Sequence, residues 1–438
     1  MIDTCEYAVK TGEKSADEVE AFWIKKVSTT VKAEMGEINT TLSTGYEGIR
    51  IRVVKNKALG SAFSYRLDKD SVIQAIERAL AASRAAGRDN YWDSLPSQGK
   101  YPQVEYDPRM ENIEPEDLAA AVMEILGSLP DNVRVRSLAH EVILQKRGCV
   151  NSNGVEHEDK SSQENLALYA VGTLKEGVTP SFYEASFSNV YNPDPLLLVG
   201  EVTRKIRLFK NREHASSGQF EVVLSPLVLL KLFYYTLFKA LTGDTVTREK
   251  SFFTGKRGEK VADSLFTLHD NGKIREGISS REMDDEGIPC QDTPLIRKGI
   301  LEGFIWNDYW AKRTGGTSTG NAHYNDRMGV MSIQQSNMVV YPGRHTRDQL
   351  FSIKDGYYIE GVQGAHGSNP ESGDFSVVCT PAYRIREGKL CGGVTGIMLS
   401  DNVYSLLQKI DGAGRDVEVR EFAVLPHIRF RDVNMVAR

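Results

Sequence analysis

Three consecutive carboxylates form the densest group of chemistry-capable side chains in this chain of 438 residues. Asp284, Asp285 and Glu286 precede a Gly-x-Pro turn at Gly287–Pro289. Clustered carboxylates can hold a cation or act as acid and base, because crowding raises the pKa of at least one of them. An acidic turn with solvated charges explains the same residues, and the chemistry taken alone favours that structural interpretation.

A loop rich in glycine and hydroxyl groups follows at Thr314–Asn321 (TGGTSTGN). Glycine lets a backbone approach a ligand closely, and hydroxyl and amide groups offer donors, so Thr317, Ser318 and Asn321 are candidate ligand contacts. No Gly-Lys-Ser/Thr follows, which excludes a Walker A loop. His323 lies just beyond, among aromatic residues that either line a peptide groove or pack as core. A plain flexible loop is the competing interpretation.

A second glycine-rich loop spans Gly361–Asp374 and leads into a predicted strand. His366 is the histidine that its context places best for a role at a site, and Asp374 ends the loop in a Gly-Asp-Phe sequence. A solvent-exposed loop histidine without a ligand is the favoured interpretation of His366.

The pattern of a zinc-binding helix is missing from the sequence. Such a helix carries two histidines and a glutamate on one segment, so that they converge on one ion. The two His-Glu pairs, His140-Glu141 and His157-Glu158, lack a second histidine and lie in predicted strands. His323, His366, Cys379 and Cys391 suit zinc by type, but nothing in their spacing indicates convergence.

Several segments together resemble the TldD/PmbA family of metalloprotease subunits, once called modulators of DNA gyrase. The specific part is the C-terminal half, through the segments Ser251–Asp270, Asp284–Asn321, Gly361–Phe375 and Gly393–Asn402. The family's catalytic branch carries His-Glu-x-x-x-His just before a Gly-Asp pair such as Gly243-Asp244. Counting back from that pair places Tyr234, Tyr235 and Lys239 at these positions, and no histidine occurs between His214 and His269.

The resemblance therefore implies the TldE/PmbA-like branch, without catalytic residues or metal in this chain. On this interpretation, Tyr234 and Lys239 line what remains of the catalytic cleft, and Asp284–Glu286 is a structural motif shared by both branches of the family. The implied partner is a TldD-like subunit that carries zinc, in a heterodimer, with self-association as the alternative, and the implied substrate is a peptide or unfolded chain. Two other hypotheses stay open: a peptide-binding or regulatory module without catalysis, and a self-sufficient hydrolase using Asp284–Glu286 with His323 or His366.

Composition narrows the function classes and the compartment. A net charge of −5 and a pI near 6.0 argue against nucleic acid as a main partner, and we interpret the basic run Arg204–Arg212 as the solvated face of a helix. Five scattered cysteines form no disulfide framework. The N-terminus has no apolar signal core, and charges and a proline interrupt the apolar run Val222–Leu241, so we expect a cytoplasmic protein without a membrane span.

Periodicity predicts an α+β protein. Residues 1–212 form an N-terminal region of antiparallel sheets with helices on one face, possibly as two similar units, 1–110 and 111–212. Residues 213–438 form a β-rich domain, a curled sheet or partial barrel around a buried helix at Leu227–Leu241. The finer predictions include turns or bulges at Gly45 and Gly48 and strands at Ile300–Trp306 and Glu418–Val424.

Overall fold

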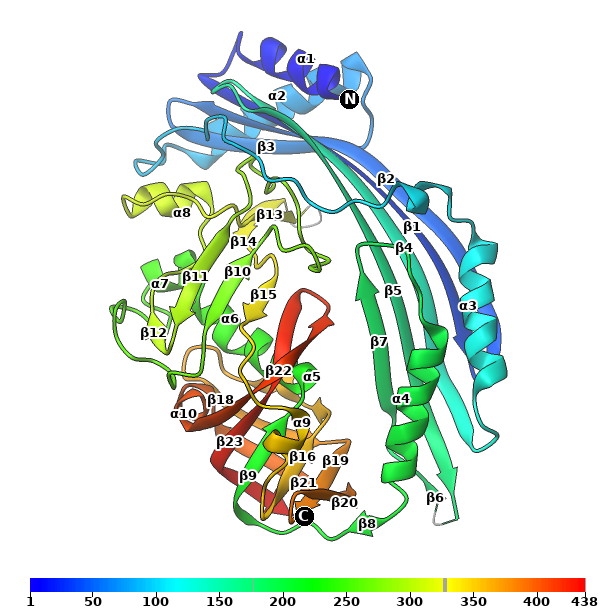
Figure 1. Ribbon diagram of the computed structural model, residues 1–438. Coiled ribbons are helices and arrows are strands. Elements are labelled where there is room, and N and C mark those ends of the chain that lie inside the picture. Colours follow the sequence, from blue (N-terminus) through cyan, green and yellow to red (C-terminus); the bar gives the residue numbers. More distant parts are fainter. Residues whose placement is uncertain (176, 326–328, 438) are drawn as a thin grey trace.

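Two lobes, each built on its own sheet, make up the computed structural model, which describes residues 1–175, 177–325 and 329–437 (Figure 1). The first sheet has seven strands, the second has fourteen, and a two-stranded ribbon is added to the second lobe. The α+β class predicted from the sequence is confirmed. No helix in the described ranges is both long and apolar enough to cross a membrane.

The first sheet is antiparallel throughout and follows the order β3-β2-β1-β4-β5, with β6 and β7 both pairing with β5. Its strands are β1 (Glu18–Glu34), β2 (Glu37–Lys55), β3 (Ala58–Ser64), β4 (Val133–Asn151), β5 (Glu156–Leu174), β6 (Gly177–Val178) and β7 (Phe182–Ser188). Strands from residues 1–110 and from residues 111–212 thus join in one continuous sheet. Gly45 and Gly48 lie inside β2, so the turns or bulges predicted there are wrong.

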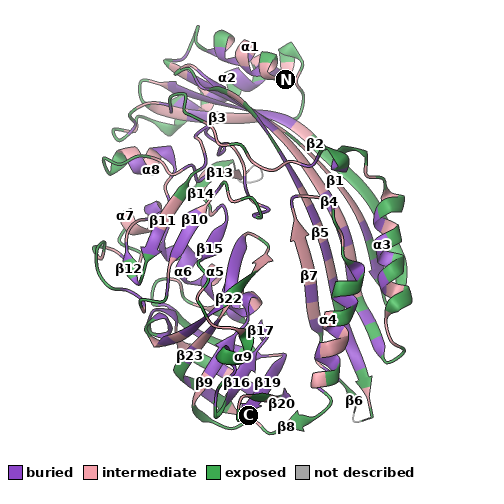
Figure 2. Cartoon of the chain, viewed as in Figure 1, coloured by how far each residue is buried: buried purple, intermediate pink, exposed green. Residues whose placement is uncertain are grey.

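Four helices cover the convex face of this sheet (Figures 1 and 2). They are α1 (Ile2–Gly12), α2 (Lys69–Ala86), α3 (Pro115–Ser128) and α4 (Pro195–Leu208), with the 3-10 turn η1 (Pro108–Asn112) before α3. Strand side chains alternate between faces, so Val19 and Ala21 of β1 pack under α1 and α2, and Val31 packs under α3. The intervening residues, such as Phe22, face the second lobe, where Phe22 packs against Met283.

The second sheet curls around a buried helix. Its strands are β8 (Arg212–Glu213), β9 (Gly218–Leu224), β10 (Leu268–Asn271), β11 (Asp292–Arg297), β12 (Ile300–Leu301), β15 (Met338–Val340), β16 (Asp355–Ile359), β17 (Val362–Gln363), β18 (Asp374–Cys379), β19 (Ala382–Arg386), β20 (Lys389–Val394), β21 (Ile397–Asn402), β22 (Ile410–Arg420) and β23 (Ala423–Ala437). The ribbon is β13 (Ala322–Asn325) with β14 (Val330–Ile333).

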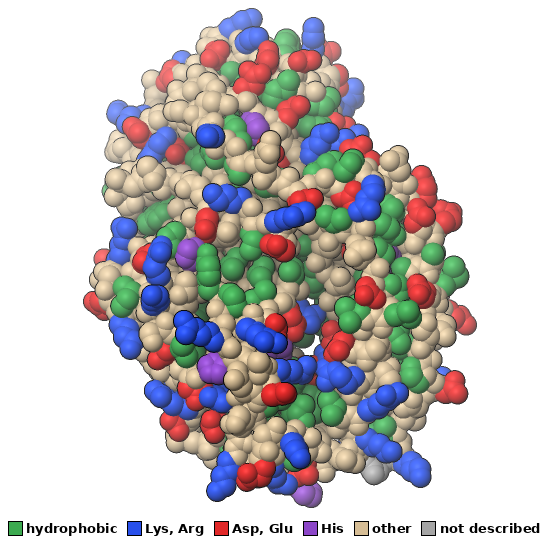
Figure 3. All heavy atoms as spheres, viewed as in Figure 1, with side chains coloured by type: hydrophobic (Ala, Val, Ile, Leu, Met, Phe, Trp, Pro, Cys, Tyr) green, Lys and Arg blue, Asp and Glu red, His purple; other side chains and the backbone are tan. Residues whose placement is uncertain are grey.

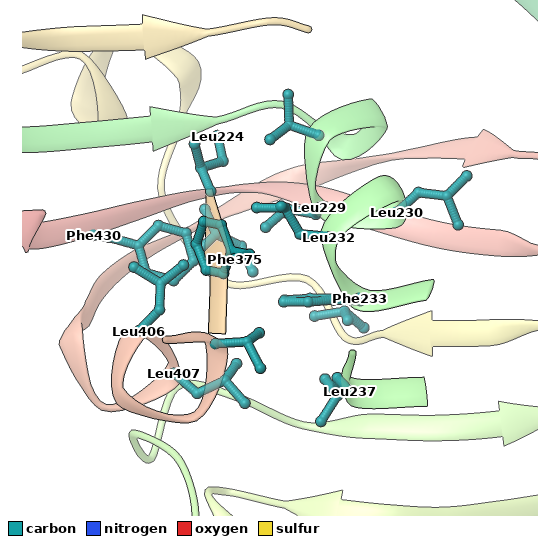
Figure 4. Close-up of a cluster of buried hydrophobic side chains, with 14 of the residues drawn as sticks. Leu224, Leu229, Leu230, Leu232, Phe233, Leu237, Phe375, Leu406, Leu407 and Phe430 are labelled. Carbon is teal, nitrogen blue, oxygen red and sulfur yellow. The ribbon is translucent and has the colours of Figure 1, made fainter. Parts of the chain in front are cut away.

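Helices of this lobe are short, and α5 is its centre. They are α5 (Pro226–Tyr235), α6 (Leu237–Ala240), α7 (Gly243–Thr247), α8 (Asp308–Arg313), α9 (Arg347–Leu350) and α10 (Val403–Leu406), with 3-10 turns η2 (Ala365–Gly367) and η3 (Leu407–Lys409). Figure 4 shows Leu229, Leu232 and Phe233 of α5 among the side chains of the main core. Proline at the first turn and the Ser225 hydroxyl, which accepts the Val228 N–H, start the helix.

Three predicted elements of this lobe need correction. The helix expected at Leu227–Leu241 is broken at Thr236, whose hydroxyl donates to the Leu232 carbonyl and whose backbone leaves helical geometry. The strand expected at Ile300–Trp306 ends at Leu301, and α8 follows unpredicted. The strand expected at Glu418–Val424 is the turn of the β22–β23 hairpin together with its flanks.

Close packing of β3 against α2 yields a stability test. A Cβ added at Gly60 would lie 2.0 Å from the Ala79 carbonyl oxygen and 2.3 Å from the Ser83 nitrogen, both main-chain atoms. Gly60→Ala must therefore push α2 off the sheet, and we expect a loss of about 1–3 kcal/mol in thermal or urea unfolding. Gly127→Ala in α3, where nothing lies within 4 Å, is the matched control and should be neutral or stabilising. Equal effects of the two changes would contradict this packing argument.

Candidate functional site

A groove of about 480 Å³ runs along α5 between the 362–366 segment and the β22–β23 turn. Its wall includes Lys231, Tyr234, Tyr235, Gln363, His366 and Phe422. The Tyr234 ring contacts the Phe422 ring, with centroids 5.5 Å apart, and His366 stands exposed on η2. Burial lowers the pKa of Lys231. Tyr234 and His366, selected separately from the sequence, thus line the same groove.

Lys239 completes an aromatic–cation cluster at one side of this groove. Its Nζ lies 5.8 Å from the Tyr234 ring centroid and 5.4 Å from that of Tyr235. The two rings meet edge to face, 4.9 Å apart. Thr236 separates the two rings, at the end of α5, from Lys239 on α6. The three positions that the family resemblance assigns to metal ligation therefore do lie together in space.

This cluster does not fit a zinc ion. Zinc in proteins is bound by cysteine, histidine and carboxylate groups, whereas these positions offer two phenols and an ammonium. An ammonium at the centre of the site would also repel a divalent cation. Across the described ranges, no group of three or more His, Cys, Asp or Glu side chains is arranged to hold a metal ion.

The Asp284–Glu286 run lies elsewhere, buried between the two lobes, so the prediction of solvated charges is wrong. Asp284 accepts the N–H groups of Glu286, Ile288 and Ala322, which fixes the turn. Asp285 accepts from Arg281 at 3.1 Å, and His323 Nδ1 lies 3.4 Å from its other oxygen.

Arginines of the first sheet complete this buried network. Glu20 on β1 accepts from Arg50 at 2.7 Å and from Arg52 at 2.6 Å, both on β2. Arg52 also donates to Glu286 at 2.7 Å, and Arg50 donates to the Asp285 main-chain oxygen. The carboxylate run is thus an anchor between the lobes. Sequence reasoning missed Arg50 and Arg52 as partners, because alternation with buried aliphatic residues does not show what the opposite face of the strand contacts.

The pKa values of these buried carboxyl groups shift in opposite directions, depending on which charges lie beside them. Burial and the Glu286 carboxylate raise the pKa of Asp284 to about 7, and the same two causes raise that of Asp308 to about 6. Burial also acts to raise the pKa of Asp285, but Arg281 and His323 outweigh it and hold that pKa well below its usual range.

The remaining candidates lie apart from the α5 groove. His323 and Asp285 border a separate cavity of about 490 Å³ against the first sheet. Thr317 lines a hollow beside Trp306, and the Ser318 hydroxyl donates to the Trp306 carbonyl. Asn321 is buried and donates a hydrogen bond to Asp270 at 2.6 Å. Asp374 is exposed and accepts hydrogen bonds from Asn402 at 2.8 Å and from Ser372 at 2.7 Å. His323 and His366 therefore border different cavities.

Two family models match the chain. One, described as the PmbA/TldA metallopeptidase C-terminal domain, matches residues 217–437, and another, PmbA/TldA metallopeptidase domain 1, matches residues 19–83. An uncharacterized protein of Methanocaldococcus jannaschii is 27% identical over 431 residues, which cover 97% of this chain and 98% of that protein. A metalloprotease TldD homolog of Haemophilus influenzae is 32% identical over 219 residues, 49% of this chain and 45% of its own length.

Solved structures share the whole fold. TldE from Thermococcus kodakarensis superposes with a TM-score of 0.94 at 28% identity, over 99% of this chain and 100% of that one. A Thermotoga maritima protein described as a putative modulator of a DNA gyrase gives a TM-score of 0.91 at 20% identity, over 99% of each chain, which shows a shared fold.

Arg52 offers a direct test of the interlobe network. Arg52→Met leaves Glu20 and Glu286 buried with fewer partners, and breaking a buried ion pair in this way costs about 3–5 kcal/mol. We expect a large fall in the thermal unfolding midpoint. Arg66→Met, at an exposed pair with Asp68, should change stability by less than about 0.5 kcal/mol. Similar midpoints for both variants would show that the network is dispensable.

Asp308 gives a pH-dependence test. Its pKa of about 6 in the folded protein exceeds the ordinary 3.8, so the folded state holds this proton more tightly than the unfolded state does. The stabilisation is complete below about pH 4 and is lost as the pH rises through 6, by up to roughly 3 kcal/mol. Asp308→Asn removes this dependence, so the stability gap between wild type and variant should change between pH 4 and 7 in urea titrations. Parallel pH profiles would contradict the assignment.

Proposed function

Because the chain belongs to the PmbA/TldD family of metallopeptidases, we propose that it acts as a TldE-type subunit of a peptide-degrading complex. In this proposal the chain itself holds no metal. A TldD-like partner subunit supplies the zinc ion and its activated water, and the present chain supplies wall and substrate contacts.

One observation carries the proposal: Lys239 lies over the Tyr234 and Tyr235 rings, at the positions where the family resemblance places the metal-binding helix residues of the catalytic branch. The scaffold around these positions is intact, since α5 remains packed in the main core. The match to TldE over the full chain supports the same branch. A retained scaffold with a changed metal position is what an accessory subunit requires.

The groove along α5 suits an extended peptide. Tyr234, Tyr235 and Phe422 offer aromatic surface, and Lys231 offers positive charge for a carboxylate. Lys239 adds positive charge beside the Tyr234 ring. In the described part of the chain β17 pairs with β18 only, so the main chain of a peptide can add beside it. The substrate class that follows is a peptide or an unfolded chain bound by main-chain hydrogen bonds.

A reconstitution assay tests this function. We expect no peptidase activity from this chain alone, and expect its addition to a TldD-like metalloprotease to raise the cleavage of an unstructured peptide. The purified, tag-free chain should carry less than about a tenth of an equivalent of zinc after dialysis, because its donors do not suit the ion. Tyr235→Ala should lower activity in the mixture several-fold. Tyr65→Ala, an exposed tyrosine outside the groove, is the control and should leave it unchanged.

Two results would reject the proposal. Cleavage by this chain alone with about one equivalent of tightly held zinc would make it an enzyme in its own right. Peptide binding without any effect on turnover by the partner would make it a binding or regulatory module.

A further inference from the structure

The cavity of about 490 Å³ that Asp285 and His323 border lies between the first sheet and loops of the second lobe. We name it the Lys26 cavity, after the lysine on its floor. Residues 278–281 and 334–336 of the second lobe form its roof. Figure 3 shows acidic and basic side chains interspersed over the face in view, so a preference for one ligand charge requires a local site.

The floor of the Lys26 cavity is one row of side chains across four neighbouring strands. Lys26 on β1 lies directly opposite Tyr46 on β2 and Gln145 on β4, and Gln145 lies directly opposite Ser161 on β5. Directly opposite residues of antiparallel strands point to the same face, with Cβ atoms about 4.5–5.5 Å apart. All four side chains line the cavity. The row therefore places one ammonium between an aromatic ring and an amide.

Three members of this row have no partner within the protein. Among the described residues, no hydrogen bond or ion pair involves the Lys26 ammonium, the Gln145 amide or the Ser161 hydroxyl. Lys26 and Gln145 are half-buried and Ser161 is 9% exposed, so a ligand in the cavity can contact them. The Ser279 hydroxyl on the roof has no partner among these residues either. Such N–H and O–H donors suit a ligand with acceptor oxygens.

The cavity carries an excess of positive charge. Arg147 and Arg281 border it, and each is already paired, Arg147 with Asp159 at 2.6 Å and Arg281 with Asp285 at 3.1 Å. Asp285 is the one carboxylate that lines the cavity in the described part of the chain, and the imidazole beside it can only add positive charge. The Lys26 ammonium is therefore left without a counterion, which an anionic group of a ligand would supply.

One end of the cavity is aromatic. Its lining includes four aromatic side chains, Phe22, Tyr46, Phe63 and Tyr324. A Cβ added at Gly48 would lie 2.4 Å from a Phe63 ring atom, so this ring lies against the face of β2 that also carries Tyr46. Lys26 thus has aromatic surface on one side and the polar groups of β4 and β5 on the other.

We propose that the Lys26 cavity binds the C-terminal residue of a peptide, with its free carboxylate at Lys26 and a large apolar side chain against the Tyr46 and Phe63 rings. The peptide source of this carboxylate rests on the proposed function. A carboxylate and a side chain that leave one Cα fit the short spacing between the opposite positions of Lys26 and Tyr46. The Gln145 amide and the Ser161 hydroxyl remain for hydrogen bonds to the last peptide group.

Calorimetric titration of the full chain tests this proposal. The ligands are acetyl-Ala-Ala-Phe with a free carboxylate, the same peptide as its amide, acetyl-Ala-Ala-Ala with a free carboxylate, and acetate. Wild type should bind the phenylalanine acid about tenfold or more tightly than its amide, because the amide cannot form the charge-assisted hydrogen bond. It should also bind this acid more tightly than the alanine acid, which buries no aromatic ring.

A pair of neighbouring lysines locates the binding site. Lys26→Met removes the charge and keeps an unbranched side chain, and it should abolish the preference for the acid over the amide. Lys25→Met is the matched control, because Lys25 is the exposed neighbour on β1 and points to the opposite face of the sheet, and it should keep the preference. A preference that survives in Lys26→Met would place carboxylate binding outside this cavity and overturn the proposal.

The wild-type titrations decide the matter even if Lys26→Met fails to fold. Equal binding of the phenylalanine acid and its amide would overturn the proposal. Equal affinity for acetate would overturn its peptide part, and equal affinity for the alanine acid would overturn its aromatic part. These titrations need no metalloprotease partner, so failure of the reconstitution assay with an intact preference for the acid would reject the proposed function and leave the cavity assignment standing.

Discussion

Pairing among Glu20, Arg52 and Glu286 fixes how the two lobes sit against each other. The first two residues belong to the first sheet and the third to the second lobe, and all three side chains are buried. Charges that have left water must keep their partners, because an unpaired one costs several kcal/mol. The lobes can therefore not slide without breaking a pair.

The irregular connector from residue 88 to 107 adds contacts to the same interface between the two lobes. Trp92, buried, donates to Glu18 on β1, and Lys312 of α8 donates to the Ser94 carbonyl at 2.8 Å. Further along, the Tyr101 hydroxyl donates to the Gly287 carbonyl at 2.8 Å. The connector thus contacts both lobes over its length. Its Pro and Tyr residues suit a segment that packs as a strap without forming a helix or strand.

Local pattern predicted most of the elements, and long-range contacts decided the rest. The α+β class and the long strand β1 follow from alternation. The helix break at Thr236 depends on the hydrogen bond of one hydroxyl group, and the hydrophobic periodicity of the sequence does not indicate such a bond. Tyr234 was selected as a candidate cleft residue by its spacing in the sequence from Gly243-Asp244. The assignment of the run Arg204–Arg212 to a solvated helix face is wrong for Lys205, which is buried and pairs with Glu360 at 2.7 Å. This pair could not be predicted, because distant elements bring the two residues together and each taken alone has the pattern of an ordinary surface charge.

The core side of α5 explains how the side chains of its groove face can vary while the fold persists. Leu229, Leu232 and Phe233 are buried and hold the helix in place. Tyr234 lines the groove, where a change of side chain leaves these core contacts in place. Such positions can change while the fold persists, so membership of a metallopeptidase family does not by itself assign catalysis to a chain. The chemistry of each chain must be argued from the side chains that face its groove.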